Sequence, residues 1–337
     1  MQRRTLMKMA GAAGVGLAAP WAKADAVVLK YGWHGPATEP TYQNSMEPFG
    51  KAVTADSGGT VKVQMFPGGT LGKDPSGQVK YLQDGVLDIV FLIPSYTPGR
   101  FPDNGVFELP GLYNNATEAS LAMWRMFQKG MLRGYEDLHV LQLATTYPNL
   151  IHTREPLKSI DELKGKKLRV SGPVAGDTVR ALGAVPVGLP VTQAAESISR
   201  GVVDGTVQDW NTYAAFRLTD AAKQHLAVPL GQAPMLVAMT KARHDSLPEP
   251  AKAALARHGG EKLVREVGGL HDRITAQWRE RVKTERGHVV TTLSDADMKA
   301  FQSRVQPVIE AWASAHPRGK ELLAAVQQEL VAIRAGK

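Results

Sequence analysis

Short blocks of apolar residues, separated by polar stretches, follow one another along the first part of the chain. The segments "VVLKYGW" (27–33) and "TVKVQMF" (60–66) alternate apolar and polar side chains, and "VLDIVFLI" (86–93) is apolar almost throughout. Alternation is typical of a half-buried strand, and a short apolar run is typical of a buried one. Helical patterns over about 41–56 and 75–84 separate these blocks. The order predicts a β-α-β-α-β unit.

A second unit of the same kind lies further along the chain. Strand patterns over 167–171, 184–189 and 202–208 alternate with helical patterns over about 175–182 and 192–200, and each helical pattern ends at a glycine. Parallel strands that are joined through helices cross over in a right-handed sense. Two such units predict an α/β protein with two lobes, each built on a largely parallel sheet.

The remaining segments connect and cover these two units. A helix near 117–131 and the strand "HVLQLAT" (139–145) lie between them without a low-complexity linker, so we expect the chain to cross between the lobes as ordered strands. A long helical pattern begins at the capping sequence "SLPE" and extends to Arg281. A short strand and two amphipathic helices follow, and we expect this region to pack on the lobes.

The N-terminus has the composition of an export signal. The sequence "MQRRTLMKMAGAAGVGLAAPWAKA" has a basic start, a short apolar run and small residues near its end. This pattern predicts a signal peptide over 1–24 that is cleaved near Ala24. The pair Arg3-Arg4 favours the twin-arginine route, with an ordinary secretory signal as the alternative. Cleavage removes four basic residues and no acid, so the net charge of +8 becomes +4. We therefore expect a periplasmic protein.

Composition and motifs narrow the possible function classes. The chain has no cysteine, which excludes disulfide and thiol chemistry. Its basic residues are dispersed rather than gathered into runs, so we expect no nucleic-acid partner. The sequence lacks the Gly-x-Ser-x-Gly, His-Glu-x-x-His, phosphate-loop and dinucleotide-binding patterns, and its nine histidines are scattered without metal-ligand spacing. We expect no cofactor, no metal site and no catalytic residue.

Arg169, in the strand "KLRV", is the most informative candidate residue. Strands in the middle of an α/β domain are usually apolar on both faces, so an arginine there needs an explanation. Arg169 lies at the carboxyl end of its strand, where open α/β sheets bind ligands. The segment behind it, "SGPVAGDT", leads into a helix N-terminus and contains Gly172 and Gly176, which would let a ligand approach the backbone. An arginine in this place suits a carboxylate ligand, and an ion pair with a core acid or simple exposure is the alternative.

Several longer segments resemble the extracytoplasmic solute receptors of TRAP transporters, the family typified by the C4-dicarboxylate receptor. The first lobe carries "FPGGTLGKD", "YLQDGVLDIVF" and "FELPGLYNN" in the order of that family. The second part carries "PLKSIDELKGKKLRVSG", "LGAVPVGLPVTQAAESISRGVVDG" and "SLPEPAKAAL". The resemblance covers almost all of residues 26–330.

The resemblance implies a two-lobed periplasmic binding protein fold, type II-like, with mixed sheets around a parallel core and a long helix spanning both lobes. It places 25–146 and about 235–280 in lobe I, and 147–234 and about 281–337 in lobe II and the C-terminal helices. In that family the arginine of the "LKGKKLRV" segment binds the substrate carboxylate, and here that residue is Arg169. The implied partners are a small organic acid and the TRAP membrane permease; some relatives are homodimers.

Strand-end residues from both lobes are candidates to line the binding site with Arg169. They are Gln208, Trp210, Asn149, Tyr147, Tyr213, Trp33, His34, Glu39, Tyr96, Ser95 and Asp74. For the aromatic members the alternative is packing between the lobes, and for Glu39 and Asp74 it is helix capping. Asn149 falls where many family members carry a second basic residue, which weakens the case for a dicarboxylate. We therefore rank a monocarboxylate with an apolar or aromatic body first, then a keto or hydroxy acid, then a dicarboxylate.

Two other functions compete with transport. A ligand-loaded sensor that docks on a signalling receptor would need the same two-lobed clamshell, and the sequence does not separate it from a transport receptor. An enzyme on the same fold is the other alternative, and the missing catalytic motifs count against it. We expect a periplasmic receptor that captures an organic acid anion by lobe closure and delivers it to a TRAP permease.

Overall fold

The computed structural model describes residues 25–337 of the 337-residue chain and contains two mixed β-sheets, each the centre of one lobe. The predicted signal peptide lies outside the described residues. Lobe I is built on a five-stranded sheet in the order β2-β1-β3-β10-β4. Strands β1, β2 and β3 are parallel, and β10 runs antiparallel to both β3 and β4. The bounds are β1 Val27–Gly32, β2 Val61–Phe66, β3 Ile89–Leu92, β4 Leu138–Thr145 and β10 Pro234–Thr240.

Lobe II is built on a six-stranded sheet in the order β11-β9-β5-β8-β6-β7. Strands β6, β7 and β8 are parallel, as the β-α-β pattern predicts, while β5 runs antiparallel to β8 and β9. The one strand of this sheet that runs opposite to the others, β5, is where the chain first enters the lobe. The bounds are β5 Leu150–Thr153, β6 Lys167–Val170, β7 Val185–Gly188, β8 Gly205–Gln208, β9 Gln224–Ala227 and β11 Val289–Thr292.

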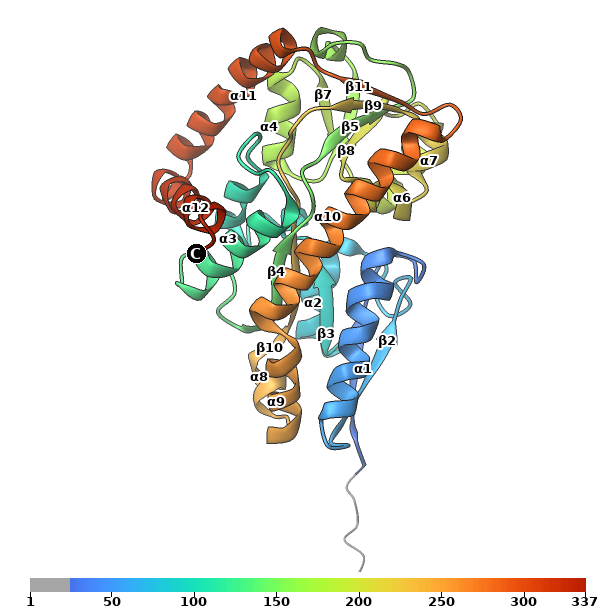
Figure 1. Cartoon of the computed structure of the whole chain (residues 1–337). Helices are drawn as coiled ribbons and strands as arrows, with labels where there is room; N and C mark the ends of the chain where they lie inside the picture. Colours follow the sequence, from blue (N-terminus) through green and yellow to red (C-terminus); the bar gives the residue numbers. More distant parts are fainter. Residues whose placement is uncertain (1–24) are drawn as a thin grey trace, which may run out of the picture.

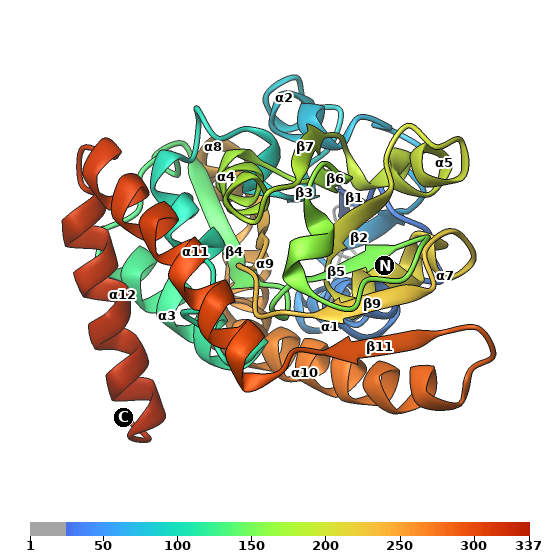
Figure 2. The same ribbon diagram turned by 90° about the horizontal axis from the view of Figure 1, so that it is seen from above.

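Helices cover both sheets and bridge the two lobes (Figures 1 and 2). In lobe I they are α1 Glu47–Asp56, α2 Gln78–Gln83, α3 Ala116–Gln128, α8 Lys241–Asp245 and α9 Glu249–His258. In lobe II they are α4 Pro173–Ala181, α5 Ala194–Ser199, α6 Trp210–Ala215 and α7 Leu218–Ala221. The last three are α10 Gly260–Thr284, α11 Asp295–Ala315 and α12 Gly319–Arg334. Two short 3-10 helices in lobe I, η3 Pro94–Tyr96 and η4 Pro102–Glu108, face the second lobe.

Four segments join the lobes, the last of them being the step from α11 to α12, and the first two are paired with each other. The turn after β4 runs beside the connection from β9 to β10: the Thr146 N–H donates to the Ala233 carbonyl at 2.9 Å, and the Asn149 N–H donates to the Gly231 carbonyl at 3.1 Å. A Cβ on Gly231 would lie 1.8 Å from the Glu108 carbonyl oxygen, so this close crossing requires glycine. The chain thus crosses between the lobes as hydrogen-bonded backbone, but the crossing segments 146–149 and 228–233 are not the strands that we expected.

The third connection is α10, which crosses the molecule diagonally from lobe I to lobe II (Figure 1). The sequence pattern predicts one helix from about 249 to 281, and this prediction is wrong at Gly259–Gly260, where α9 ends and α10 begins. Gly260 has φ +70°, and a Cβ on Gly259 would lie 3.1 Å from the Leu141 carbonyl oxygen of β4. The close approach to the sheet and the left-handed backbone break the helix there.

The last helix belongs by its packing to lobe I, although we grouped 281–337 with lobe II and the C-terminal helices. Leu322, Val326 and Leu330 of α12 are buried in the same core cluster as Met123 of α3. Figures 1 and 2 both show α12 beside α3. The three leucine and valine side chains form one apolar stripe at helical spacing, and the apolar face of α3 is the surface that covers it.

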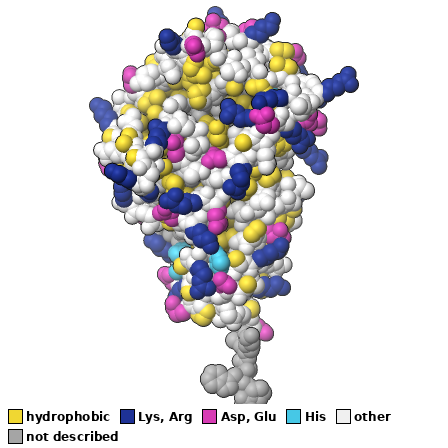
Figure 3. Space-filling model, viewed as in Figure 1, with side chains coloured by type: hydrophobic (Ala, Val, Ile, Leu, Met, Phe, Trp, Pro, Cys, Tyr) yellow, Lys and Arg dark blue, Asp and Glu magenta, His cyan; other side chains and the backbone are white. Residues whose placement is uncertain are grey.

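The surface of the described residues carries both signs of charge. On the face seen in Figure 3, Lys and Arg side chains lie among Asp and Glu side chains rather than in one basic patch. Within residues 25–337, the helices are all too short or too polar to cross a lipid bilayer.

Candidate functional site

A cavity of about 40 Å³ lies between the two lobes. Six of the predicted site residues line it, and they come from both lobes: Trp33, His34, Glu39, Tyr96, Arg169 and Gln208. Strand ends supply most of these positions, because Trp33 follows β1, Arg169 lies at the end of β6 and Gln208 closes β8. The carboxyl ends of the parallel strands in both sheets therefore face the same space.

Arg169 is buried, with 1% of its surface exposed, and its guanidinium is held from three directions. Its Nε donates to the Leu189 carbonyl at 2.7 Å, Nη1 donates to Gln208 Oε1 at 2.6 Å, and Nη2 donates to the Tyr96 hydroxyl at 3.1 Å. A guanidinium has five N–H donors, so these three bonds leave two available. The neighbours orient the arginine without using all of its donors.

None of these neighbours is an acid. Within residues 25–337, no carboxylate oxygen lies within 4 Å of the Arg169 guanidinium. Buried charges in proteins are normally paired, because desolvation of an unpaired charge is expensive. The alternative in which Arg169 forms an ion pair with a core acid is therefore not what the structure contains.

Tyr96 connects Arg169 to lobe I. Its hydroxyl oxygen accepts from Arg169 Nη2 and also from the backbone N–H of Val191 at 3.1 Å, and both of these donors belong to lobe II. Since Tyr96 itself comes from η3 of lobe I, the two bonds close one side of the cavity only when the lobes are together. The hydroxyl proton of Tyr96 remains free to donate.

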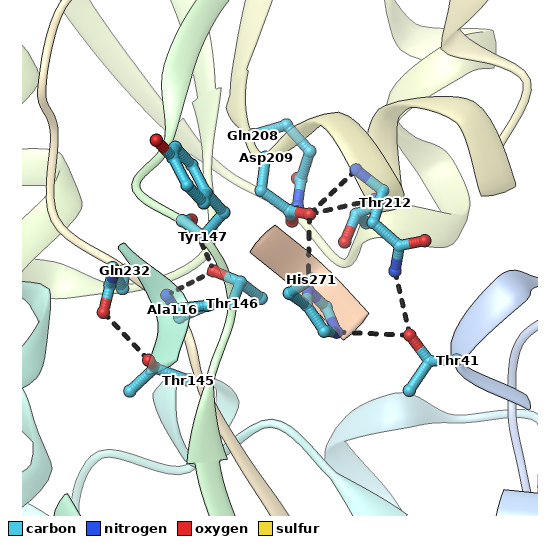
Figure 4. Close-up of polar contacts among 12 residues, drawn as sticks. Thr41, Ala116, Thr145, Thr146, Tyr147, Gln208, Asp209, Thr212, Gln232 and His271 are labelled. Atoms are coloured by element: carbon cyan, nitrogen blue, oxygen red, sulfur yellow. Dashed lines mark hydrogen bonds and ion pairs between the residues drawn. The ribbon is translucent and has the colours of Figure 1, made fainter. Parts of the chain in front are cut away.

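A second set of polar contacts crosses between the lobes, and Figure 4 shows its members Thr41, Asp209 and His271. Asn211 Nδ2 donates to Glu39 Oε1 at 2.7 Å and to Thr41 Oγ1 at 3.0 Å. Thr41 Oγ1 also lies 3.2 Å from His271 Nε2, and His271 Nδ1 lies 4.0 Å from Asp209 Oδ1. Asp209 caps α6 by accepting from the N–H groups of Asn211 and Thr212. His271, in α10, thus lies between groups from the two lobes.

Aromatic rings form one wall of the cavity. Trp33 packs edge-on against Phe91 with 4.7 Å between ring centroids and lies 4.8 Å from His34. Burial lowers the pKa of His34 to about 4, against the opposing effect of the Asp74 charge. His34 is therefore neutral at pH 7, and it presents an uncharged ring beside the two aromatic side chains.

A smaller cavity of about 10 Å³ lies beside the main one. Of the predicted residues, Asn149 alone lines it, together with Glu108 of η4. Ser95 Oγ donates to Glu108 Oε1 at 2.8 Å. Burial raises the pKa of Glu108 to about 7, and the hydrogen bond from Ser95 opposes this shift. Asn149 and Ser95 thus contact the seam between the lobes rather than the main cavity.

The other predicted site residues do not line the main cavity. Trp210 and Tyr213 pack in the core of lobe II, where both rings contact His152 at centroid distances of 4.9 and 4.3 Å. Tyr147 borders a shallow recess on the outside of the hinge. Asp74 accepts from the Ser76 N–H and caps a 3-10 turn, which is the capping alternative proposed for it.

The N-terminus of α4 faces lobe I rather than the cavity. A Cβ on Gly172 would lie 3.1 Å from Ser95 and 3.3 Å from Glu108 Oε2, so the space that we assigned to a ligand is filled by these two residues. Gly176 faces Pro186 and Val170 at ordinary contact distances. The approach of a ligand to the backbone at Gly172, which we expected, is therefore blocked in the closed arrangement of the lobes.

Several residues that line the cavity were not predicted from the sequence. They are Thr41, Phe91, Ile93, Thr146, Ser171, Val191, Asn211, Thr212, Phe216, Ala233, Met235 and His271. Asn211 and Phe216 lie in the segment that follows β8, whose last residue is Gln208, so their position after a strand end could have identified them. No pattern in the sequence pointed to His271, because it lies in the middle of a long polar helical segment.

The described residues contain no candidate metal-binding site. Among residues 25–337, no three His, Asp or Glu side chains converge in a way that could hold a metal ion.

Comparisons with known proteins place this geometry in a family. The model of the family described as bacterial extracellular solute-binding protein, family 7, matches residues 32–315. A marine metagenome TRAP solute binding protein from an unidentified microbe, specific for aromatic acid ligands and solved with 3-hydroxybenzoate, is 29% identical with a TM-score of 0.86. That alignment covers 91% of this chain and 98% of the other.

Two further relatives support the same assignment. A TRAP solute binding protein from Rhodoferax ferrireducens, in complex with copurified benzoate, is 26% identical with a TM-score of 0.86, covering 91% of this chain and 98% of that chain. The protein YiiZ of Salmonella typhimurium is 25% identical over 280 residues, covering 80% of this chain and 82% of its own length. The predicted resemblance and the two-lobed fold are confirmed: the chain belongs to the bacterial extracellular solute-binding protein family 7, the solute-binding proteins of TRAP transporters.

Proposed function

We propose that this protein is a periplasmic TRAP receptor that binds a monocarboxylate with an aromatic or apolar body through Arg169 and delivers it to a membrane permease. The observation that carries the proposal is the buried Arg169 guanidinium, which borders the interlobe cavity and has no acidic partner among residues 25–337. The charge that would compensate it has to come from a bound molecule.

The free donors of Arg169 define the group that binds there. A carboxylate accepts two parallel N–H bonds from a guanidinium, and such charge-assisted bonds are among the strongest in proteins. Gln208 Oε1 and the Leu189 carbonyl hold the plane of the guanidinium in place. The Tyr96 hydroxyl has a proton to donate to the same carboxylate. This set recognises one carboxylate.

The remaining wall of the cavity favours an apolar body. Trp33, Phe91 and Phe216 line it, and among residues 25–337 no lysine or second arginine does. Aromatic side chains bury large areas and stack on aromatic ligands. The two solved relatives described above are in complex with 3-hydroxybenzoate and with benzoate, which supports an aromatic acid for this chain.

Binding requires the lobes to move. The cavity of about 40 Å³ is smaller than the roughly 150 Å³ of a cavity that holds benzene. We therefore infer that the ligand enters between open lobes and that the bonds from Tyr96 and Asn211 re-form as the lobes close around it. A ligand stabilises the closed form only through its higher affinity for that form. The protein binds and releases its ligand without a covalent step.

A thermal-shift screen of the chain from residue 25 against a library of carboxylates tests the proposal. A ligand at a hundred times its Kd adds about 2.7 kcal/mol to the free energy of unfolding, which raises the Tm by several degrees. Aromatic monocarboxylates should stabilise the wild type and leave Arg169→Ala unchanged. Arg180→Ala, which removes a surface arginine paired with Asp177, should respond like the wild type. Stabilisation of Arg169→Ala by the same acids would refute the arginine's role.

Delivery to a permease needs its own measurement. Membrane vesicles that carry the permease subunits should accumulate radiolabelled ligand only when the loaded receptor is added outside. Tight binding without such uptake would instead favour the sensor function.

A further inference from the structure

Three of the residues that line the main cavity each have a buried polar atom with no hydrogen-bond partner within residues 25–337. The atoms are His34 Nδ1, Asn211 Oδ1 and His271 Nδ1. Their residues are 7%, 2% and 1% exposed. A buried polar atom without a partner costs free energy, so a cluster of three around one cavity calls for a ligand group that satisfies them.

The role of Asn211 is set by its neighbours. Its Nδ2 donates to the Glu39 carboxylate and to Thr41 Oγ1, and a carboxylate only accepts. The amide nitrogen therefore faces Glu39, and Oδ1 is the unpaired atom. It needs a donor, an O–H or N–H group.

The role of His271 follows from the same network. Thr41 Oγ1 accepts from Asn211, and its own proton has one recorded neighbour that can accept, His271 Nε2. With Nε2 accepting, the His271 ring carries a proton on Nδ1, which is then a donor. His34 is neutral at pH 7, so its Nδ1 either donates or accepts. Together the three atoms offer one fixed acceptor, one donor and one atom of either kind.

The charged residues around these three atoms determine which ligand group can bind there. Glu39 and Asp209 are both buried next to these residues, and His271 Nδ1 lies 4.0 Å from Asp209 Oδ1. A second carboxylate on the ligand would meet two carboxylates and an acceptor oxygen, all of which repel it. A hydroxyl group donates one hydrogen bond, accepts others and carries no charge. It matches the mixture of donor and acceptor.

We propose that His34, Asn211 and His271 form a second polar subsite that binds a hydroxyl substituent of the carboxylate held by Arg169. The preferred ligand is then a hydroxylated aromatic monocarboxylate, not the unsubstituted acid and not a dicarboxylate. This inference rests on the proposed function, because it places the hydroxyl relative to a carboxylate already bound at Arg169.

Calorimetric titration with matched acids tests the subsite. The probes are benzoate with its three hydroxy isomers, phenylacetate with mandelate, and isophthalate as the dicarboxylate. At least one hydroxy acid should bind the wild type at least tenfold more tightly than its parent acid, because a site built around a hydroxyl rejects the analogue that lacks it. Isophthalate should bind more weakly than benzoate.

Two variants and one control complete the test. His34→Phe keeps an aromatic ring against Trp33 and Phe91, and Asn211→Leu removes the fixed acceptor. Each should reduce the preference for the hydroxy acid to less than threefold. The preference is the ratio of the two affinities within one variant, so a loss of lobe-closing contacts that weakens both acids cancels from it. Thr275→Val removes another buried, unpaired polar atom, one that lies outside the cavity, and should leave the preference intact.

The outcomes separate the two proposals. Equal affinities for every hydroxy acid and its parent in the wild type, or a preference that survives in both variants, would overturn the subsite and leave the carboxylate receptor standing. In that case ordered water satisfies the three atoms. Failure of all seven acids to bind would overturn the aromatic-acid receptor and the subsite with it.

Discussion

Arg169 lies between the lobes and Asp103 lies inside lobe I, and both are buried charged residues. They differ in whether residues of the same chain compensate their charge. Asp103 is fully buried, and it is surrounded by basic groups of its own chain. Arg133 donates to it from its side chain, with the Nη2–Oδ1 distance at 2.6 Å, and from its backbone N–H. His316 Nε2 lies 3.1 Å and Arg318 Nη1 lies 3.5 Å from its carboxylate. Arg169 is buried to the same degree and has no such partner in the described part of the chain.

The partners of Asp103 also explain its ionisation. Burial raises the pKa of this carboxyl, but the hydrogen bonds and the charge of Arg133, with a contribution from His316, outweigh burial and lower it. The result is a charged group that ties the connection between α11 and α12 to η4. The charge of Asp103, which stabilises the fold, is compensated within the chain. The charge of Arg169, which we propose binds the ligand, is compensated only when a ligand is bound.

The largest effect on stability is expected from Asp103→Ala. The substitution leaves Arg133, His316 and Arg318 without their shared partner and opens space in lobe I. Since Arg133 and Arg318 are partly exposed and can be hydrated, we expect a loss of about 3 kcal/mol of unfolding free energy rather than more. Chemical denaturation measures the loss, and calorimetry should find ligand affinity unchanged. A loss of unfolding free energy below about 1 kcal/mol would show that Asp103 does not stabilise the fold more than Arg169 does.

Glu108 provides a second test, because it is a buried acid at the seam with no basic partner in the described residues. Its raised pKa means that the folded protein holds a proton which the unfolded chain has released above the ordinary carboxyl pKa. Stability should therefore fall as the pH rises from about 4.5 to about 7. Glu108→Gln should be more stable than the wild type by on the order of 2 kcal/mol at pH 8, and no more stable at pH 4.

Chemical denaturation of the wild type and of Glu108→Gln across this pH range gives the difference in their unfolding free energies. Other titrating groups are the same in both proteins, so their contributions cancel from this difference. A difference that does not change with pH would show that Glu108 stays ionised in the folded protein.

A smaller effect is expected from Tyr96→Phe. The variant loses the hydroxyl that accepts from Arg169 and from the Val191 N–H across the lobes. One such bond contributes about 1 kcal/mol, so the Kd for the carboxylate should rise roughly fivefold to tenfold. Tyr147→Phe is the matched control, because its ring lies outside the cavity, and its affinity should equal that of the wild type. Equal losses in the two variants would point to a general effect of removing a hydroxyl.

The smallest effect on stability is expected from Arg169→Met. Methionine fills most of the same volume and removes an uncompensated buried charge, so the unfolding free energy should change by no more than about 1 kcal/mol. Binding of the carboxylate should nevertheless be lost. A variant that unfolds as readily as Asp103→Ala would show that Arg169 is needed for the fold, and the comparison between the two charges would fail.

Much of the fold was predictable because it depends on local patterns. The strands β1, β2 and β3 and the parallel group β6, β7 and β8 follow alternating or apolar segments bounded by glycines. The break between α9 and α10 and the docking of α12 on lobe I were not predictable. Both depend on contacts with β4 and α3, which are far away in sequence.

The sequence by itself determined the order of the elements, the two-lobed α/β class and the place of Arg169 and Gln208 at strand ends, because strand and helix periodicity and the position of a strand end are properties of neighbouring residues. Only the tertiary structure decided that Arg169 has no acid beside it, that His271 and Asn211 reach its cavity and that Trp210 does not. These facts depend on how two lobes and a spanning helix close together, and contacts between distant segments leave no periodic pattern in the chain.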